Sequence, residues 1–402
     1  MIASACLLCR TQQVEQLLDF GPQPICNRFL AAPDSEEAAF PMRLGQCGAC
    51  GLVQMIAPVP AAELKPRCDW ITYNEPEEHL DRLADVLAAL PGLTKQSAVC
   101  GISFKDDSLL RRLRERGYLR TRRIDPCEDL GIPEAGVGVE TIQHRLDSQT
   151  TAQIAAARGR SDLVIARHIW EHVSDPAGFV HALKGLMTPN GYLLFEIPDC
   201  ERALDACDYS TVWEEHTLYF TPATFRRGVS VSGLALSYYE CFPQALENSL
   251  VAVGRLGEDG GCEPLSTVTL EQEKSRGKAF ADGLAVHRKR IGSYFARYRR
   301  EHGKIAILGA GHLACTYINL LELREHIDCL VDDNPHKRGT FMPGSRLPIY
   351  DSSALIGRGI KLCLLSVNGE IEARVIQKNA AFTQAGGVFH SIFPTSRHTL
   401  RF

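Results

Sequence analysis

The sequence predicts an α/β protein in three parts, a small N-terminal module followed by two domains in which strands and helices alternate. Residues 1 to about 60 are broken by Pro and Gly and carry two Cys-x-x-Cys pairs. From about residue 96, short apolar runs alternate with helical periodicity, which is typical of a parallel sheet covered by helices. A second series of this kind begins at Lys304. We therefore expect domains at 1–72, 73–265 and 266–402.

Composition narrows the possible classes of function. A chain of 402 residues predicts two to three domains, at about 150 residues each. The net charge of -4 argues against a general nucleic-acid binder, which needs a basic stripe. No apolar run approaches the roughly 18 to 20 residues that span a bilayer, and the N-terminus does not resemble a secretory signal. We therefore expect a cytoplasmic protein with a small-molecule substrate, and a monomer or homodimer that binds neither membrane nor nucleic acid.

The middle domain shows the clearest periodicity. Leu80, Leu83 and Leu87 recur at helical spacing in 74–91, and Pro91 closes that helix. Strands are expected over 97–103, 119–124, 161–167 and 191–198. Further helices are expected over 109–118, 151–157 and 177–187. The alternation predicts a parallel sheet with helices on both faces.

The last domain begins after a long charged helix over 269–300, which we interpret as a bridge. Strands are then expected over 304–309, 327–333 and 361–367. The turn after the first of these has the pattern Gly309-x-Gly311-x-x-Ala314 and opens a helix, an arrangement that favours phosphate. Three interpretations remain open for this turn, namely contact with a nucleotide diphosphate, a purely structural turn, and NAD binding.

Two cysteine pairs predict a structural metal site. Cys6-x-x-Cys9 and Cys47-x-x-Cys50 offer four thiolates, which can close a tetrahedral zinc site. The segment is too short to build a core of its own, and a metal offsets that deficit. The alternatives are four unrelated buried thiols or a redox pair.

The order of several short motifs resembles one family. They are the cysteine pairs, residues 21–30, 47–54, 197–199, 213–220, 332–339 and 368–371. This set resembles the bacterial zinc-containing sugar C-methyltransferases, which act on dTDP-activated keto-deoxysugars. The resemblance implies a class I methyltransferase Rossmann-like domain between the zinc module and a second Rossmann-like domain. It also implies S-adenosylmethionine (SAM), zinc and a nucleotide-sugar substrate.

The resemblance also points to the cofactor loop, which departs from the family pattern. The family has an acidic residue near Gly101 and glycines near Ser103 and Asp107, and all three are missing here. Glycines let the backbone approach the cofactor closely, so side chains on this turn should crowd it. Asp125 matches the acidic residue that holds the ribose, and Asp106 matches a loop carboxylate. The cofactor residues that the resemblance implies are Gly101, Ser103, Asp106, Asp125 and Arg167.

Base catalysis is the next expectation. Methylation of a carbon beside a ketone needs a base that removes the α-proton, and histidine titrates near working pH. In the family, the base is the last histidine of a Tyr-His-Glu-His motif, and Trp213-Glu214-Glu215-His216 stands in that position. We expect His216 as the base, Glu215 to orient it, and His172 as a further catalytic candidate. The expected substrate contacts are Tyr219, Asn248, Gly309, Gly311 and Lys337.

The leading hypothesis is therefore a SAM-dependent C-methyltransferase for a nucleotide-activated keto-deoxysugar or a related metabolite of deoxysugar biosynthesis. A second hypothesis is a cofactor-free descendant that binds or isomerises a sugar nucleotide by the same proton abstraction. A third is a nicotinamide enzyme that uses the last domain.

Overall fold

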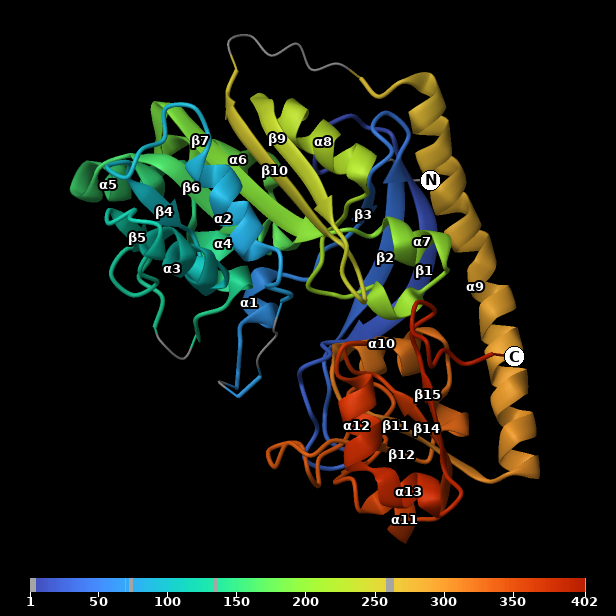
Figure 1. The fold of residues 1–402 in the computed structure, drawn as a ribbon. Coiled ribbons are helices and arrows are strands. Elements are labelled where there is room, and N and C mark those ends of the chain that lie inside the picture. The colour runs from blue at the N-terminus through green and yellow to red at the C-terminus, as the bar shows by residue number, and fades with distance from the viewer. Residues whose placement is uncertain (1–4, 69, 72–74, 134–135, 258–263, 402) are drawn as a thin grey trace.

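The computed structural model describes residues 5–68, 70–71, 75–133, 136–257 and 264–401 (Figure 1). Three sheets form its frame. Each predicted boundary between domains adjoins residues outside the described ranges, and the boundaries stay predictions. Among the described residues, no helix combines the length and apolarity needed to cross a membrane.

The first sheet is antiparallel and has the order β1-β2-β3-β8. Its strands are β1 (Val14–Pro24), β2 (Ala39–Cys47), β3 (Val53–Met55) and β8 (Leu218–Tyr219). The last strand comes from a distant part of the chain, so this sheet ties the N-terminal module to the loop that carries His216. A short helix, α1 (Ala61–Leu64), follows β3.

The second sheet has the order β5-β4-β6-β7-β10-β9. Its strands are β4 (Val99–Gly101), β5 (Thr121–Arg123), β6 (Ser161–Arg167), β7 (Met187–Pro198), β9 (Leu234–Phe242) and β10 (Ser249–Leu256). The first four in this order are parallel, as predicted, whereas β10 is antiparallel to both neighbours. Parallel strands with an antiparallel pair at one edge are the arrangement of class I methyltransferases, so the predicted fold class is confirmed.

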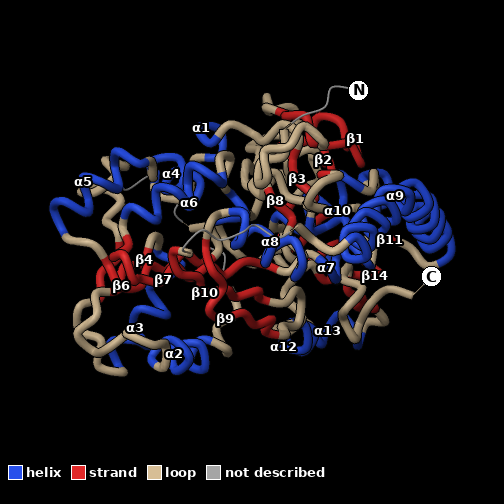
Figure 2. Tube along the Cα trace, turned by 90° about the horizontal axis from the view of Figure 1, so that it is seen from above, coloured by secondary structure: helices blue, strands red, loops and turns tan. Residues whose placement is uncertain are grey.

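Helices cover both faces of the second sheet (Figure 2). On one face lie α2 (Leu80–Ala88) and α3 (Asp107–Glu115), and on the other α4 (Val139–Arg145), α5 (Ser148–Arg158) and α6 (Pro176–Gly185). Caps fix several starts, because Asp147 and Asp175 accept the Thr150 and Gly178 N–H groups. After β7 come α7 (Glu201–Asp205) and α8 (Pro222–Val231).

One predicted helix starts later than expected. The helix predicted over 74–91 begins at Leu80, and residues 75–77 have no regular secondary structure. Pro76 explains the difference, because the residue before a proline is disfavoured in helical geometry. Residue 74 itself lies outside the described residues. The later start leaves the Glu75 side chain free to face the cleft described below.

The third sheet is parallel and has the order β13-β12-β11-β14-β15. Its strands are β11 (Lys304–Leu308), β12 (Cys329–Val331), β13 (Ile349–Tyr350), β14 (Ile360–Leu365) and β15 (Val388–Ser391). Its helices are α10 (His312–Leu320), α11 (Ala354–Gly357), α12 (Glu372–Lys378) and α13 (Ala380–Gln384). This is the second Rossmann-like domain that the sequence predicts.

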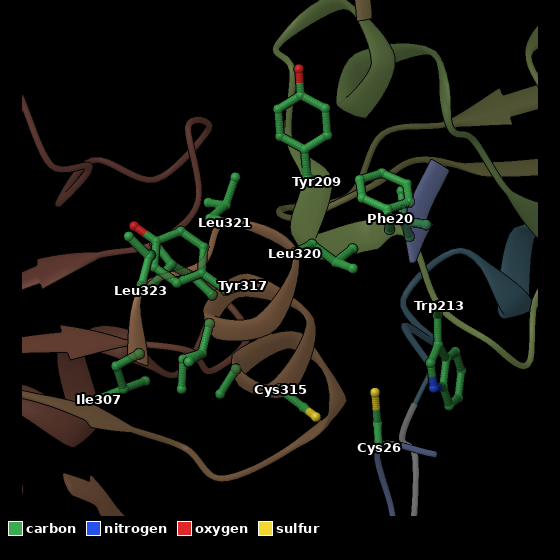
Figure 3. Close-up of a cluster of buried hydrophobic side chains, with 14 of the residues drawn as sticks. Phe20, Cys26, Tyr209, Trp213, Ile307, Cys315, Tyr317, Leu320, Leu321 and Leu323 are labelled. Atoms are coloured by element: carbon green, nitrogen blue, oxygen red, sulfur yellow. The ribbon is translucent and has the colours of Figure 1, made fainter. Parts of the chain in front are cut away.

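A 35-residue helix, α9 (Thr267–Glu301), runs along the outside of the first and third sheets (Figure 1). Its buried side chains, Phe280 and Phe295 among them, join a core that the two sheets share. Figure 3 draws that core, with Phe20 from β1, Tyr209 and Trp213 from the segment before β8, and Tyr317 from α10. The N-terminal module and the last domain therefore pack together around the loop that carries His216.

Candidate active site and zinc centre

The four predicted metal ligands meet in one cluster. The Sγ atoms of Cys6 and Cys50 lie 3.7 Å apart, and those of Cys9 and Cys47 lie 3.6 Å apart. All four sulfurs lie within 4.8 Å of one another. A tetrahedral zinc ion with Zn–S bonds of about 2.3 Å separates its sulfurs by about 3.8 Å. The cluster therefore fits zinc and leaves no open coordination position for chemistry.

A cleft of about 1190 Å³ lies where the three sheets meet. It reaches the carboxyl ends of β4 and β6 in the second sheet and of β11 and β14 in the third. In each sheet those two strands are neighbours, and the chain leaves them toward opposite edges of the sheet. Open α/β sheets bind ligands at such topological switch points. Because its volume exceeds the roughly 300 to 1,000 Å³ of a single small-molecule pocket, the cleft has room for two ligands.

Two histidine side chains face each other in this cleft. His216 lies in the loop before β8, and His172 follows β6. Their ring centroids are 4.7 Å apart, with the planes nearly perpendicular. Burial, together with the neighbouring His172, lowers the pKa of His216 well below its usual range. His216 is therefore neutral at physiological pH and can accept a proton.

His172 has the opposite character. Its Nδ1 lies 3.2 Å from Glu140 Oε1, and its Nε2 lies 4.0 Å from Glu171 Oε1. Burial alone would lower the pKa of His172, but these two carboxylates raise it above its usual value. The pKa values of these two neighbouring imidazoles are thus shifted in opposite directions. Pairs whose environments push their pKa values apart are typical of acid–base sites.

Glu215 faces away from the neighbouring histidine of its own loop. Its Oε1 accepts a hydrogen bond from Asn27 Nδ2 at 3.0 Å, and its carboxyl group lies within 4.8 Å of Glu140 and His172. Burial and the charges of Glu140 and Glu214 raise the pKa of Glu215 well above its usual value. These contacts link Glu215 to the far side of His172, whereas the sequence suggested that it orients His216.

The predicted cofactor loop turns inward. Asp106 is fully buried, and its carboxylate accepts hydrogen bonds from the N–H groups of Ile102, Ser103 and Arg167. Burial raises the pKa of Asp106 to about 7. A Cβ atom added at Gly101 would come within 2.8 Å of Asp106 Cβ, so Gly101 is required by this carboxyl group. Asp106 therefore organises the loop from inside and does not line the cleft; Phe104 and Lys105 line it instead.

Asp125 and Arg167 are also engaged by the protein. Asp125 Oδ1 accepts the Cys127 and Glu128 N–H groups, both at 2.8 Å, and so caps the turn after β5. These N–H groups lower the pKa of Asp125. Arg167 is buried, and its Nε donates to Glu196 Oε2 at 2.5 Å. Neither side chain lines the cleft, although His168, directly after Arg167, does.

In the last domain, the two predicted glycines differ in what requires them. Gly309 has φ +102°, and a Cβ there would come within 2.5 Å of Ser366 O, so the turn itself requires glycine. Gly311 has open space around its Cα, lines the cleft and precedes α10. Lys337 also lines the cleft, and its Nζ donates to Asp332 Oδ2 at 2.9 Å. Gly311 and Lys337 are thus the predicted substrate residues that the cleft brings together.

Two other predicted substrate residues support loops instead of lining the cleft. The Tyr219 hydroxyl accepts the Trp213 N–H and donates to the Trp213 carbonyl, which clamps the loop that carries His216. Asn248 donates to Asp199 Oδ2 at 3.0 Å and accepts from Arg202. Their contacts are local and lie outside the cavity lining.

Sequence reasoning missed several cleft residues, notably Glu140, Glu75, His168 and Glu247. His168 stands beside a predicted residue, and its φ of +47° is unusual for a residue other than glycine. Glu140 carries no motif at all and enters the site only because α4 folds against the turn after β6. Its helix was not predicted.

Comparison with known proteins agrees with this architecture. Residues 6–64 match the family profile Methyltransf_13, described as a "Putative zinc binding domain". Residues 269–394 match Methyltransf_14, the C-methyltransferase C-terminal domain. The C-methyltransferase NovU of Streptomyces niveus is 22% identical over 404 residues, which cover 98% of this chain and 96% of that protein. The chain is thus similar to C-methyltransferases in its first and last domains, and to NovU over nearly its full length.

Further relatives cover only part of the chain. The ubiquinone biosynthesis O-methyltransferase of Ralstonia nicotianae is 28% identical over 186 residues, 44% of this chain and 69% of that protein. The 1,6-didemethyltoxoflavin-N1-methyltransferase of Burkholderia thailandensis covers 45% of this chain and 80% of its own, at 13% identity and a TM-score of 0.31. The CcbJ methyltransferase of Streptomyces caelestis covers 47% of this chain and 100% of its own, at 12% identity and a TM-score of 0.29.

The expected enzyme class, a methyltransferase, is confirmed by the C-terminal domain match and the full-length relative. Its cofactors follow from that class: zinc at the four cysteines and SAM as methyl donor. The cleft has room for SAM at the end of β4. The segments that line it there include residues at 104–105, 137–140 and 168–172.

Proposed function

We propose that this chain transfers a methyl group from SAM to the carbon beside a ketone in a nucleotide-linked keto-deoxysugar. The observation that carries the proposal is the pairing of His216 with His172, whose ring centroids lie 4.7 Å apart in a cleft with room for two ligands. Their surroundings lower the pKa of His216 and raise that of His172. We retain the domain division at 1–72, 73–265 and 266–402 as part of this proposal.

The proposed chemistry uses each histidine once. SAM supplies, when bound, a methyl group on a cationic sulfur. His216 takes the α-proton of the sugar, and the electron pair of that C–H bond moves into an enolate. Glu140 and Glu171 raise the pKa of His172, and its cationic form would compensate the charge that develops on the enolate oxygen. The α-carbon then bonds to the methyl group, and the sulfur keeps the electron pair of the broken bond.

The other half of the cleft suits a nucleotide diphosphate. Gly311 precedes the nine-residue helix α10, whose N-terminal dipole favours phosphate. Lys337 and Asn334 line the same wall. Trp70 stacks on His336 with ring centroids 5.1 Å apart, and the ring centroid of Phe29 lies 5.9 Å from that of Trp70. The cleft therefore offers an aromatic surface on which the nucleotide's heterocyclic base could stack. We propose Gly311 and Lys337 as pyrophosphate contacts.

The test is incubation of the zinc-loaded protein with SAM and a set of dTDP-keto-deoxysugars in D₂O. We expect a product heavier by one methyl group and, without SAM, exchange of the α-proton for deuterium. Exchange without methyl transfer would favour the alternative, a cofactor-free protein that binds or isomerises the sugar nucleotide. Neither exchange nor transfer with any keto-sugar nucleotide would contradict both readings, and NADH fluorescence would then test the nicotinamide hypothesis.

The carboxylate of Glu140 yields a pH prediction. His172 has a raised pKa, so its cationic form is present at low pH and is lost as the pH rises through that pKa. Glu140→Gln removes the partner at 3.2 Å and lowers the pKa of His172. The alkaline limb of the profile of kcat/KM then moves to lower pH. A hydrogen bond to a charged group is worth about 1.5–3 kcal/mol, so activity on that limb should fall about tenfold or more.

This prediction has a readout that needs no substrate. The imidazole of His172 can be titrated by NMR in the wild type and in Glu140→Gln, with Glu78→Gln as a control at an exposed position. Glu140→Asp should restore part of the effect. An unchanged His172 titration in Glu140→Gln would mean that Glu140 does not hold the charge of His172.

A further inference from the structure

Four charged or ionisable side chains gather at the end of the cleft beside the altered cofactor loop. Lys105 Nζ lies 2.6 Å from Glu75 Oε1, and His168 Nδ1 lies 4.0 Å from Glu75 Oε2. Glu247, in the loop between β9 and β10, completes the group. All four line the cleft. Lys105 stands on the loop that lacks the family's glycines, where backbone contact with a cofactor was expected.

The charge states of this group are fixed by its members. Burial alone would lower the pKa of His168, but the charges of Glu75, Glu171 and Glu196 raise it to about 10. Burial opposes ionisation of Glu75, yet His168 and Lys105 lower its pKa to about 2. Burial and the charge of Glu75 raise the pKa of Glu247 to about 8. The group thus presents two cations, one anion and one carboxyl group that a neighbouring cation would ionise.

Two buried polar atoms beside this group are unsatisfied. Arg167 Nη2, a donor, and Glu171 Oε2, an acceptor, have no hydrogen-bond partner among the described residues. Arg167 is 1% exposed and Glu171 is 2% exposed. Buried polar groups in folded proteins are almost always paired, and of these two residues Glu171 lines the cleft, so its unpaired acceptor calls for a ligand with a donor.

Backbone strain marks the same position. His168 adopts φ +47°, and its N–H donates to Glu196 O at 2.8 Å. Such a conformation costs of order 1–3 kcal/mol for a residue other than glycine and persists at functional sites when the surroundings impose it. Here it turns the imidazolium toward Glu75, at the switch point of the second sheet.

We propose that this cluster is a recognition site for an α-amino-acid zwitterion, the charged end of the cofactor. The ligand's carboxylate would lie against Lys105 and His168. Its ammonium group would lie against Glu75, Glu247 and the Glu171 Oε2 acceptor. A zwitterion places an anion beside the two cations and a cation beside Glu75 and Glu247, so each buried charge gains a partner of opposite sign. Side-chain charges thus take over what glycine backbone would do elsewhere. The inference rests on the proposed use of SAM.

Calorimetry on the full-length, zinc-loaded protein separates this inference from the proposed function. The two probes are S-adenosylhomocysteine and 5′-methylthioadenosine, which share the adenosine and thioether but differ in the amino-acid end. Since hydrogen bonds between charged groups are each worth about 10- to 100-fold in affinity, we expect S-adenosylhomocysteine to bind about 100-fold tighter. Lys105→Met should remove about 10- to 100-fold of that preference and leave 5′-methylthioadenosine unaffected.

Lys95→Met is the matched control, because Lys95 is exposed and outside the cleft. Glu247→Gln is the second variant, and the melting temperature of each protein checks its folding. Equal affinity for the two probes, or a Lys105→Met protein with an unchanged preference, would overturn the zwitterion site and leave SAM binding intact. Absence of binding by either probe to the folded wild type would overturn the cofactor proposal and the site together.

Discussion

We expect His216→Ala to lower kcat for methyl transfer by about 10²- to 10⁴-fold, the usual contribution of a positioned general base. The physical reason is specific to this site. Burial and the neighbouring His172 hold His216 neutral at this point of the cleft. A solvent hydroxide could replace the imidazole only at high pH, so the residual activity of the variant should rise with pH.

Exchange of the sugar α-proton in D₂O measures the same step without the cofactor. We expect His216→Ala to lose exchange and methyl transfer together, because both need proton removal. His181→Ala, at an exposed position on α6, is the matched control and should retain both. If the His216→Ala protein still exchanges the proton but cannot methylate, another group removes the proton and His216 acts only in binding.

The sequence predicted those parts of the fold whose periodicity is local. The strand expected over 161–167 is β6 (Ser161–Arg167), and the bridge expected over 269–300 is α9 (Thr267–Glu301). The strand β9 escaped prediction because it lies at the sheet edge with a mostly exposed or half-buried pattern. The strand β10 was missed although its buried run over Leu250–Val253 could have indicated it. The zinc ligands could be predicted because metal geometry forces a spacing onto the sequence.

The active site was predictable only where a motif marked it. His216 and His172 stood in recognisable segments, and the structure brings them together. Glu140 and Glu247 lie in segments without any signal, and only tertiary packing carries them into the cleft. For Asp106 the error is the opposite one, a predicted contact that the structure does not place in the cleft. A motif match suggested a ligand contact, but three backbone N–H groups already hold its carboxylate inside the loop.

The zinc cluster should govern both stability and activity, although it has no open coordination position. Cys47→Ser removes one ligand, and structural zinc in isolated zinc-finger peptides contributes about 10–16 kcal/mol. Here the N-terminal sheet also packs on other cores. We therefore expect a smaller loss, seen as melting about 10 °C or more below the wild type together with loss of bound zinc. Calorimetry and metal analysis measure these, with Cys127→Ser, an exposed lone cysteine, as the control.

Loss of zinc should affect His216 through the pairing of two short strands. Directly after the second cysteine pair, the chain forms β3, which pairs with β8 through Val53 and Tyr219. The Met55 N–H also donates to Thr217 O at 2.9 Å, next to His216. If zinc holds β3 in register, its removal should lower methyl transfer by more than cofactor affinity, since β4 and its loop belong to another sheet. A zinc-free protein with full activity and an unchanged melting temperature would contradict this coupling, because the pairing of β3 with β8 would then be stable without the metal.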